Sequence, residues 1–447
     1  MSKTRSKKTR DRKTPTGVFS RSVQLFSMAG RVAAKELGTR ILPGDVQKKL
    51  QQKVETRIEQ ARVIAESLSH LKGAAMKAGQ LLSLDTTDFL PPEAVEILSR
   101  LQAQATPART DELQGVLTHE LGPEKIARIR NFSPNPVASA SIGQVHSAEI
   151  DGQRVAIKIQ YPGVSESIDS DLAILRKLAG GFVTLSGKKF SLDELFAEIR
   201  GVLIQEVDYE NERANLDRYR DQLASSVHYV VPRSFAEFST RRVLTMSFED
   251  GAPIITWAQN PHTGLQDRTH IARLMLDLFC LEFCDWGMVQ TDPNFANYLV
   301  RDNKLVCLDF GATLVYSPEF RRGYAHLLRS IASNDTETIF RNAVEFGLLD
   351  PRESFDAQEA FKDMLQVAME PFRPDHQPFR FSDPEYEKRT VKANRRFVRQ
   401  LIYSPPPRKI MFLHRKLGGM FSLMKRLGAE FDLLPYWQKM STMDTTL

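Results

Sequence analysis

The stretch QTDPNFANYLVRDNKLVCLDFG, residues 290–311, combines three polar side chains with two short apolar runs. Asp292 and Asn297 lie five residues apart, and the apolar run Tyr298–Val300 follows them directly. Asp309 opens an Asp-Phe-Gly string twelve residues after Asn297, at the end of the second apolar run. Short apolar runs bounded by turn residues predict β-strands. Each polar motif is therefore expected beside a strand.

These three side chains fit a site that transfers phosphoryl groups. An Asp and an Asn at this spacing are typical of a kinase catalytic loop, where the Asp handles the proton of the nucleophile and the Asn binds Mg²⁺. The Asp of an Asp-Phe-Gly motif binds the metal that bridges the phosphates. Upstream, Val155-Ala-Ile-Lys158 ends an apolar strand with a lysine that can pair the α- and β-phosphates of a nucleotide. Each motif alone is unspecific, but their order predicts a nucleotide site.

An acidic cluster, Glu206-Val-Asp208-Tyr-Glu210-Asn-Glu212, is expected on one long helix. Helical spacing predicts Asp208 and Glu212 on one face and Glu206 with Glu210 on another. A carboxylate of this cluster is expected to form an ion pair with Lys158. The order of motifs in kinases favours Glu212, which leaves Glu206 and Asp208 for another cation. The alternative is an acidic helix surface in contact with solvent.

A glycine-rich phosphate loop is missing. In its place stand Ala138, Ser139, Ala140 and Ser141, and Gly143 is the one glycine. Alanine and serine bring Cβ atoms to a place where backbone must approach phosphate closely. We expect these five residues to contact the nucleotide along a different phosphate path.

Composition narrows the class of protein. The chain has 447 residues, 42% hydrophobic and 26% charged, which predicts a globular fold with a sizeable core. Its 61 basic residues exceed its 55 acidic residues by six. Residues 1–13 hold seven basic side chains and one acid, so the excess lies in this arm. A body that is neutral by count argues against nucleic-acid binding.

Membrane-spanning and secreted classes are disfavoured. A spanning helix needs ~20 mostly apolar residues, and no such window occurs. Arg21 and Arg31 interrupt the apolar segment that a signal peptide would need. Three cysteines are too few for a disulfide framework, which predicts an intracellular protein. Cys280 and Cys284 lie one helical turn apart without the further ligands of a zinc site, so they are expected in the core.

The period of apolar residues predicts two lobes in an α+β fold. Helical periodicity runs through residues 45–84 and resumes after Gly251, and a sheet-rich region lies between. The expected strands and helices of that region are strands at 141–150 and 153–160 around the turn Asp151-Gly152, a helical insert at 165–185, a long helix opened by a capping box at 191–194, and strands at 227–231 and 242–248. The predicted domains are a basic flexible arm at 1–45, a helical N-terminal extension at 46–130, a sheet-rich N-lobe at 131–250 and a helical C-lobe at 251–447. The arm is expected to be a solvated tail, with attraction to anionic lipid and a mitochondrial presequence as alternatives.

Taken together, the motifs resemble those of the UbiB-type atypical kinases, a family tied to coenzyme Q biosynthesis. The motifs that carry the resemblance are Lys77-Ala-Gly-Gln80 (the KxGQ motif), Ala138–Ser141, Val155–Lys158, Glu206-Val-Asp208 (the ExD motif), Gln290–Asn297, Leu308–Thr313, Pro405-Pro-Pro and Phe412–Gly418. The resemblance implies a two-lobed protein-kinase-like fold that binds ATP or ADP with Mg²⁺ or Mn²⁺. It also implies that the helix bearing Lys77 and Gln80 packs across the active site, where Lys77 would contact the nucleotide or the ExD carboxylates.

The resemblance carries roles and partners with it. Lys158, Asp292 and Lys77 would be catalytic, Asn297 and Asp309 would bind the metal, and Gln80 and the hinge residue Met246 would contact the nucleotide. The implied partners are nucleotide, anionic membrane lipid, prenyl-quinone intermediates and coenzyme Q biosynthetic proteins, at a cytoplasmic, peripheral-membrane or mitochondrial location. No APE string follows Gly311, so no ordinary activation segment is expected. The competing hypothesis is a non-catalytic, nucleotide-gated scaffold for a membrane-bound biosynthetic complex.

Overall fold

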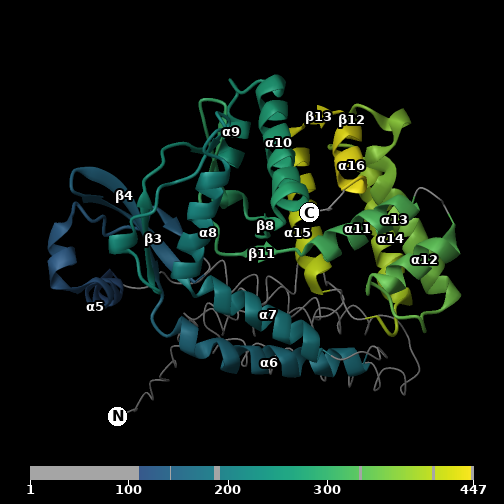
Figure 1. The fold of residues 1–447 in the computed structure, drawn as a ribbon, viewed down its shortest axis with the longest axis horizontal. Coiled ribbons are helices and arrows are strands. Elements are labelled where there is room, and N and C mark those ends of the chain that lie inside the picture. The colour runs from purple at the N-terminus through teal and green to yellow at the C-terminus, as the bar shows by residue number, and fades with distance from the viewer. Residues whose placement is uncertain (1–109, 141, 186–191, 332–334, 405–407, 444–447) are drawn as a thin grey trace, which may run out of the picture. The chain divides into compact units, whose positions relative to one another are not determined.

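The computed structural model describes residues 110–140, 142–185, 192–331, 335–404 and 408–443, all of which belong to one compact unit (Figure 1). The predictions for the basic arm, for most of the helical extension and for Lys77, Gln80 and Ser141 lie outside these residues. The predicted domain boundaries stay predictions.

An antiparallel sheet forms the N-terminal part of the described chain. Its strands run in the order β1-β3-β4-β6, and β2 pairs with β3. The bounds are β1 (Ile129–Arg130), β2 (Ala138–Ser139), β3 (Gly143–Ile150), β4 (Gln153–Gln160) and β6 (Val243–Ser247). Asp151 and Gly152 join β3 to β4 with φ of 51° and 78°, the positive values that a two-residue hairpin turn requires. The three long strands confirm the predictions at 141–150, 153–160 and 242–248. The strand predicted at 227–231 is reduced to Tyr229–Val230, which pairs with residues 305–306 and not with this sheet.

Helix α5 (Thr110–Arg128) packs against this sheet. Leu113, Leu117 and Leu121 recur every four residues, so they share one face of the helix, and all three are buried. That face lies in a core cluster with Val155 and Ile157 of β4. The helix therefore covers the sheet that carries Lys158.

The helical insert follows β4. Helices α6 (Val164–Leu185) and α7 (Asp193–Glu206) lie side by side (Figure 1), and α8 (Tyr209–Gln222) comes next. The single long helix predicted here is wrong, because the chain breaks between α7 and α8. Asp208 has extended backbone angles, and its carboxylate accepts a hydrogen bond from the Asn211 backbone N–H at 3.2 Å. An N-cap of this kind starts a new helix. The predicted capping residue Ser191 is outside the described residues, and α7 begins after Leu192.

Helices dominate the C-terminal part. Its helices are α9 (Ile254–Gln259), α10 (Leu265–Cys280), α11 (Pro318–Ile331), α12 (Thr336–Glu345), α13 (Phe355–Met369), α14 (Pro384–Gln400), α15 (Arg408–Leu427) and α16 (Leu434–Ser441), with short helical turns η2 (Leu281–Trp286), η3 (Phe295–Asn297), η4 (Glu370–Phe372) and η5 (Pro374–His376). The short turn η1 (Ala236–Phe238) belongs to the N-terminal part, because it contacts β6 and Phe238 lies in the core cluster of that sheet. The short strands of the C-terminal part are β5 (Tyr229–Val230), β7 (Ala252–Pro253), β8 (Met288–Gln290), β9 (Tyr298–Arg301), β10 (Lys304–Cys307), β11 (Thr313–Val315), β12 (Phe379–Arg380) and β13 (Glu430–Phe431). Helices α10 and α15 contact each other along the core of this lobe (Figure 1).

Two antiparallel pairings place the motif of residues 290–311. Strands β9 and β10 are the strands expected from the two apolar runs, and they pair as a hairpin with Leu305 opposite Val300. Strand β8 pairs with β11, so Gln290 lies opposite Thr313. These pairings bring the segment before Asp292 next to the segment after Asp309. None of the helices that the structure describes is long and apolar enough to cross a membrane.

Candidate active site

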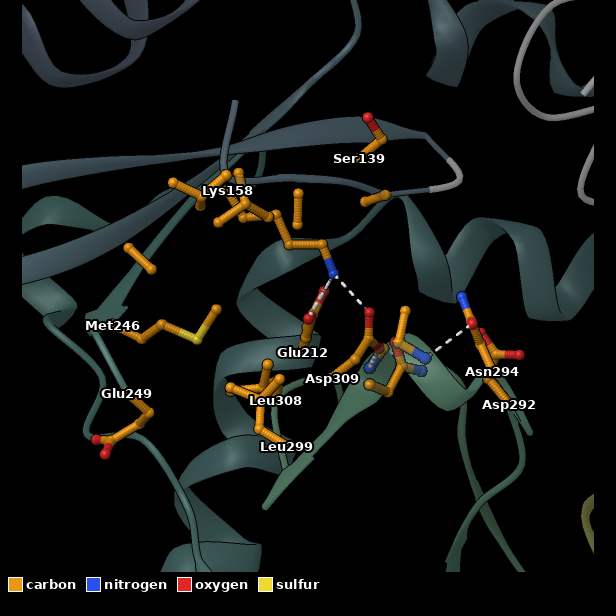
Figure 2. Close-up of a pocket in the computed structure, with 18 of the residues that line it drawn as sticks. Ser139, Lys158, Glu212, Met246, Glu249, Asp292, Asn294, Leu299, Leu308 and Asp309 are labelled. Atoms are coloured by element: carbon orange, nitrogen blue, oxygen red, sulfur yellow. Dashed lines mark hydrogen bonds and ion pairs between the residues drawn. The ribbon is translucent and has the colours of Figure 1, made fainter. Parts of the chain in front are cut away.

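One cavity of about 350 Å³ holds most of the predicted site residues (Figure 2). This volume lies within the usual range for small-molecule sites, ~300–1,000 Å³. Lys158, Asp292, Asn297 and Asp309 all line it, although they come from distant parts of the chain. Further predicted residues in its lining are Ala138, Ser139, Ala140, Glu206, Glu212 and Met246.

Lys158 is the buried cation of the site. Its Nζ lies 2.7 Å and 2.9 Å from the two carboxylate oxygens of Glu212 and 3.0 Å from Asp309 Oδ2. The side chains of Lys158 and Glu212 are 7% and 1% exposed, whereas Asp309 is 27% exposed and so faces the open part of the cavity. Figure 2 shows the ammonium pointing to both acids. One cation thus connects the N-lobe sheet, α8 and the Asp-Phe-Gly segment.

Burial shapes the protonation of this cluster. Desolvation disfavours the Lys158 ammonium, but the carboxylates of Asp309 and Glu212 outweigh it and hold the pKa of Lys158 well above its ordinary value. Desolvation raises the pKa of Glu212 to about 7, against the opposing attraction of Lys158. Glu212 is therefore an acid that can change protonation near neutral pH.

The helix break decides which acids face the cavity. Glu206 at the end of α7 and Glu212 on α8 both line it, whereas Asp208 does not. Asp208 caps α8 and lies 3.7 Å from the Arg241 guanidinium. The prediction that Asp208 shares a face with Glu212 and that Glu206 points elsewhere is wrong, because helical spacing does not continue across the break.

Asn297 and Asp309, the predicted metal ligands, both line the cavity. Asp309 Oδ1 accepts the Gly311 backbone N–H at 3.0 Å, which fixes the carboxylate at the cavity wall. The Asn297 Nδ2 is buried and has no hydrogen-bond partner among the described residues. Among the described residues no group of three or more His, Cys, Asp or Glu is placed to hold a metal. An acid and an amide without sulfur or imidazole fit Mg²⁺, which takes few protein ligands and completes its shell with water and phosphate oxygens.

Helix α15 contacts Asp292, and sequence reasoning assigned no role to this helix. The Arg415 guanidinium lies 3.5 Å from Asp292 Oδ1, and both side chains are nearly buried. A Cβ on Gly419 would lie 2.1 Å from the Pro293 Cβ, so only glycine permits this approach of helix and loop. Phe412–Gly418 is one of the motifs that carry the family resemblance. The basic residues within this otherwise apolar segment are the sequence signal that could have predicted a contact with an acidic residue.

A second buried cation, Lys416, lies beneath the same loop. Its Nζ donates to Tyr298 Oη at 2.8 Å and to Gln290 Oε1 at 3.1 Å, and lies 4.0 Å from Glu282 Oε2. Glu282 Oε1 accepts from Tyr219 Oη at 2.8 Å. These polar contacts link α15, α8 and the strands on both sides of Asp292.

The loop that replaces the glycine-rich motif lines the cavity with Ala138, Ser139 and Ala140. Ala138 and Ser139 make up β2, and the Ala140 N–H donates to the Gly143 carbonyl at 2.9 Å. Gly143 itself does not appear in the lining. A Cβ at this position would lie 2.4 Å from the Ile159 carbonyl oxygen and 2.7 Å from Tyr209 Oη, so packing of β3 on β4 and α8 requires this glycine. The predicted contact of Gly143 with the nucleotide is therefore not supported, because Gly143 does not line the cavity.

Comparison with known proteins agrees with the motifs. Residues 100–343 match the profile of the ABC1 atypical kinase-like domain. The chain belongs to this family. The resemblance to UbiB-type atypical kinases is thereby confirmed, and a kinase-like domain of this family implies nucleotide binding.

Several ABC1 relatives are similar over most of the chain. The mitochondrial atypical kinase COQ8 of Saccharomyces cerevisiae is 36% identical over 82% of this chain and 73% of its own length. The mitochondrial atypical kinase COQ8B of Rattus norvegicus is 30% identical over 98% of this chain and 84% of its own. A solved structure of Rv3197 from Mycobacterium tuberculosis, determined with erythromycin, is similar with a TM-score of 0.60 at 24% identity, covering 90% of this chain and 99% of that one. At this identity the likeness shows the α+β fold of the ABC1 kinase-like proteins.

Proposed function

We propose that this ABC1 protein hydrolyses ATP or transfers its phosphoryl group with Mg²⁺ or Mn²⁺, and that this activity supports coenzyme Q biosynthesis. One observation carries the proposal: Lys158, Asp292, Asn297 and Asp309 line a single cavity. A phosphate-binding cation, a base and two oxygen ligands for a metal are the groups that phosphoryl transfer needs. The COQ8 relatives support the link to coenzyme Q.

Each side chain has a defined part in this mechanism. Lys158, oriented by Glu212, binds the phosphates with its ammonium. Asn297 and Asp309 hold the divalent cation, which neutralises charge on the phosphate oxygens when bound. Asp292 accepts the proton of the attacking hydroxyl or water, and Arg415 positions its carboxylate. Met246 lies on the side of the cavity away from Asp292 (Figure 2), where the base of the nucleotide would fit.

The short segment after the Asp-Phe-Gly motif favours a small acceptor. Only residues 312–317 separate Gly311 from α11, and three of them form β11. A peptide substrate would need a longer activation segment to bind against. We therefore propose water or a prenyl-lipid intermediate as the acceptor. Lys77 and Gln80 keep their predicted roles at the nucleotide as part of this proposal.

Replacing one metal ligand tests the proposal. In Asp309→Asn the cation loses a charged ligand, so phosphate release should fall at least ~100-fold, the scale of losing one preorganised electrostatic contact. Asp302→Asn makes the same chemical change at an exposed turn of the β9–β10 hairpin, where φ of 50° suits asparagine, and should release phosphate like wild type.

Phosphate release and quinone content separate the enzyme from the nucleotide-gated scaffold. If the protein is an enzyme, Asp309→Asn should fail to restore quinone in a coenzyme Q-deficient strain, whereas Asp302→Asn should restore it. Equal phosphate release by wild type and Asp309→Asn, together with restored quinone, would instead identify a nucleotide-gated scaffold.

A further inference from the structure

Helix α14 has a packed face and an opposite, basic face. Tyr386 and Phe397 pack against the core of the C-terminal lobe. Exposed basic residues recur at steps of four, three and four along the other side: Lys388, Lys392, Arg395 and Arg399. Two residues turn a helix by about 200°, so this row starts opposite Tyr386. We call these four residues the α14 basic stripe.

Most of the stripe lacks acidic partners. Lys392, Arg395 and Arg399 form no ion pair with any residue that the structure describes. Two other arginines of the same helix do have partners: Arg389 lies 2.6 Å from Glu370, and Arg396 pairs with Asp363. Lys388 lies 2.7 Å from Glu385. Lys392, Arg395 and Arg399 are therefore left without an acidic partner among the described residues, on a helix whose other arginines are neutralised.

Exposed apolar side chains accompany these cations. Val391 lies next to Lys392 and is 44% exposed. Just past the end of α14, Ile402 is 37% exposed, and Phe355 at the start of α13 is 68% exposed. Ile402 and Phe355 lie close to each other through the buried Glu353. This residue precedes Phe355 by two positions, and its carboxylate accepts a hydrogen bond from the Ile402 N–H at 3.1 Å. Large apolar groups in contact with water beside free cations point to a surface that binds something.

We propose that the α14 basic stripe, with Val391, Ile402 and Phe355, is the surface on which the protein lies against an anionic phospholipid bilayer. Cations near such a surface are attracted to the lipid headgroups. Apolar side chains beside them can enter the boundary between headgroups and acyl chains. The charge alone would also suit an acidic polymer such as nucleic acid, but such a polymer offers no apolar environment to Val391, Ile402 and Phe355, whereas the headgroup–acyl boundary of a bilayer does. The family resemblance implied membrane association without naming a surface.

Vesicle binding by the full chain tests this surface. The probes are vesicles of phosphatidylcholine with and without phosphatidylglycerol, and binding is measured by co-sedimentation. Each cation near an anionic surface contributes about fivefold to affinity, so Lys392→Gln/Arg395→Gln/Arg399→Gln should bind the anionic vesicles about 100-fold more weakly. Residues 1–13 are the same in every variant, so their attraction to the vesicles cancels in the comparison.

A matched variant controls for net charge. Arg218→Gln/Arg220→Gln/Lys304→Gln removes the same charge from exposed positions on α8 and β10. Its affinity should stay within about twofold of wild type, because charges farther from the membrane than the Debye length are screened. Phe355→Ser/Ile402→Ser should weaken binding even at high salt, since salt does not screen apolar insertion. Wild-type ATP hydrolysis without vesicles by the stripe variant would show that its fold is intact and keeps this test separate from the proposed chemistry.

Two results would overturn the proposal. One is a stripe variant that binds anionic vesicles like wild type, or a control variant that loses as much. The other is binding to poly-glutamate or duplex DNA that depends on the stripe while vesicle binding does not, which would assign the surface to an acidic polymer.

Discussion

Replacing Gly419 by alanine is expected to displace the loop that carries Asp292. The new Cβ would lie 2.1 Å from the Pro293 Cβ and 3.1 Å from its Cγ. Unbonded carbon atoms prefer separations of about 3.5–4.0 Å, so the helix or the loop must move by roughly 1.5 Å. The obstacle is a proline ring and not the end of a flexible side chain, so the shift reaches the backbone next to Asp292.

The size of this shift sets the expected effect. A misplacement of about 1 Å in catalytic geometry can lower a rate about 100-fold. Overpacking of a close contact typically lowers the free energy of unfolding by about 1–3 kcal/mol. Gly419→Ala should therefore release phosphate from ATP about 100-fold more slowly than wild type and unfold at lower urea concentration.

Gly418 provides the matched control one residue away. No atom lies within 4 Å of a Cβ built at this position. Gly418→Ala should keep wild-type phosphate release and gain up to about 1 kcal/mol of stability, because alanine favours the helix. Both variants are assayed at saturating nucleotide and Mg²⁺. Equal turnover by Gly419→Ala and Gly418→Ala would refute the idea that α15 positions the loop.

Three further predictions concern buried acids. Burial raises the pKa of Glu212 to about 7 from an ordinary 4.5, so the folded protein holds this proton more tightly than the unfolded chain. The resulting contribution to the free energy of unfolding is full below pH 4.5 and is lost as pH rises through about 7. Urea denaturation should therefore show wild type losing stability relative to Glu212→Gln between these pH values, and parallel pH dependences of the two proteins would contradict the prediction. Glu353 accepts hydrogen bonds from three consecutive backbone N–H groups and from the Ser404 hydroxyl. Glu353→Ala should therefore lower the free energy of unfolding by about 3 kcal/mol and speed hydrogen exchange at the Ser404 amide. An unchanged exchange rate would count against this prediction. Lys416→Met should lower the free energy of unfolding by about 3–5 kcal/mol, because it leaves the Glu282 carboxyl buried without its cation. Adding Glu282→Gln should recover part of this loss in thermal denaturation. A double variant no more stable than the single one would contradict the pairing.

Local patterns were sufficient for the elements next to the site. Two strand-like segments on both sides of Asp151-Gly152 predicted the β3–β4 hairpin, because strand preference and a positive-φ turn are properties of neighbouring residues. The two short apolar runs likewise predicted the strands β9 and β10, but their pairing came from the structure. The order of the lysine, the Asp-Asn pair and the Asp-Phe-Gly motif was enough to predict a nucleotide site, and the resemblance of the full set of motifs predicted the family.

Helix continuity was harder to predict. The acidic cluster has good helical spacing, yet Asp208 accepts the Asn211 N–H and starts a new helix. A side chain that can cap competes with the backbone hydrogen bond of a continuing helix, and the difference in free energy is small. The orientation of Glu206 relative to Glu212 follows from that choice.

The sequence by itself thus determined the strands next to the site, the β3–β4 hairpin, the motif residues and their chemistry, since those depend on residue type and close spacing. Only the tertiary structure decided that Glu206 faces the cavity while Asp208 does not, that Gly143 serves packing, and that Arg415 and Gly419 of α15 meet the Asp292 loop. Such contacts join segments far apart in the chain, and packing of the whole lobe selects them, because no local preference favours one distant partner over another.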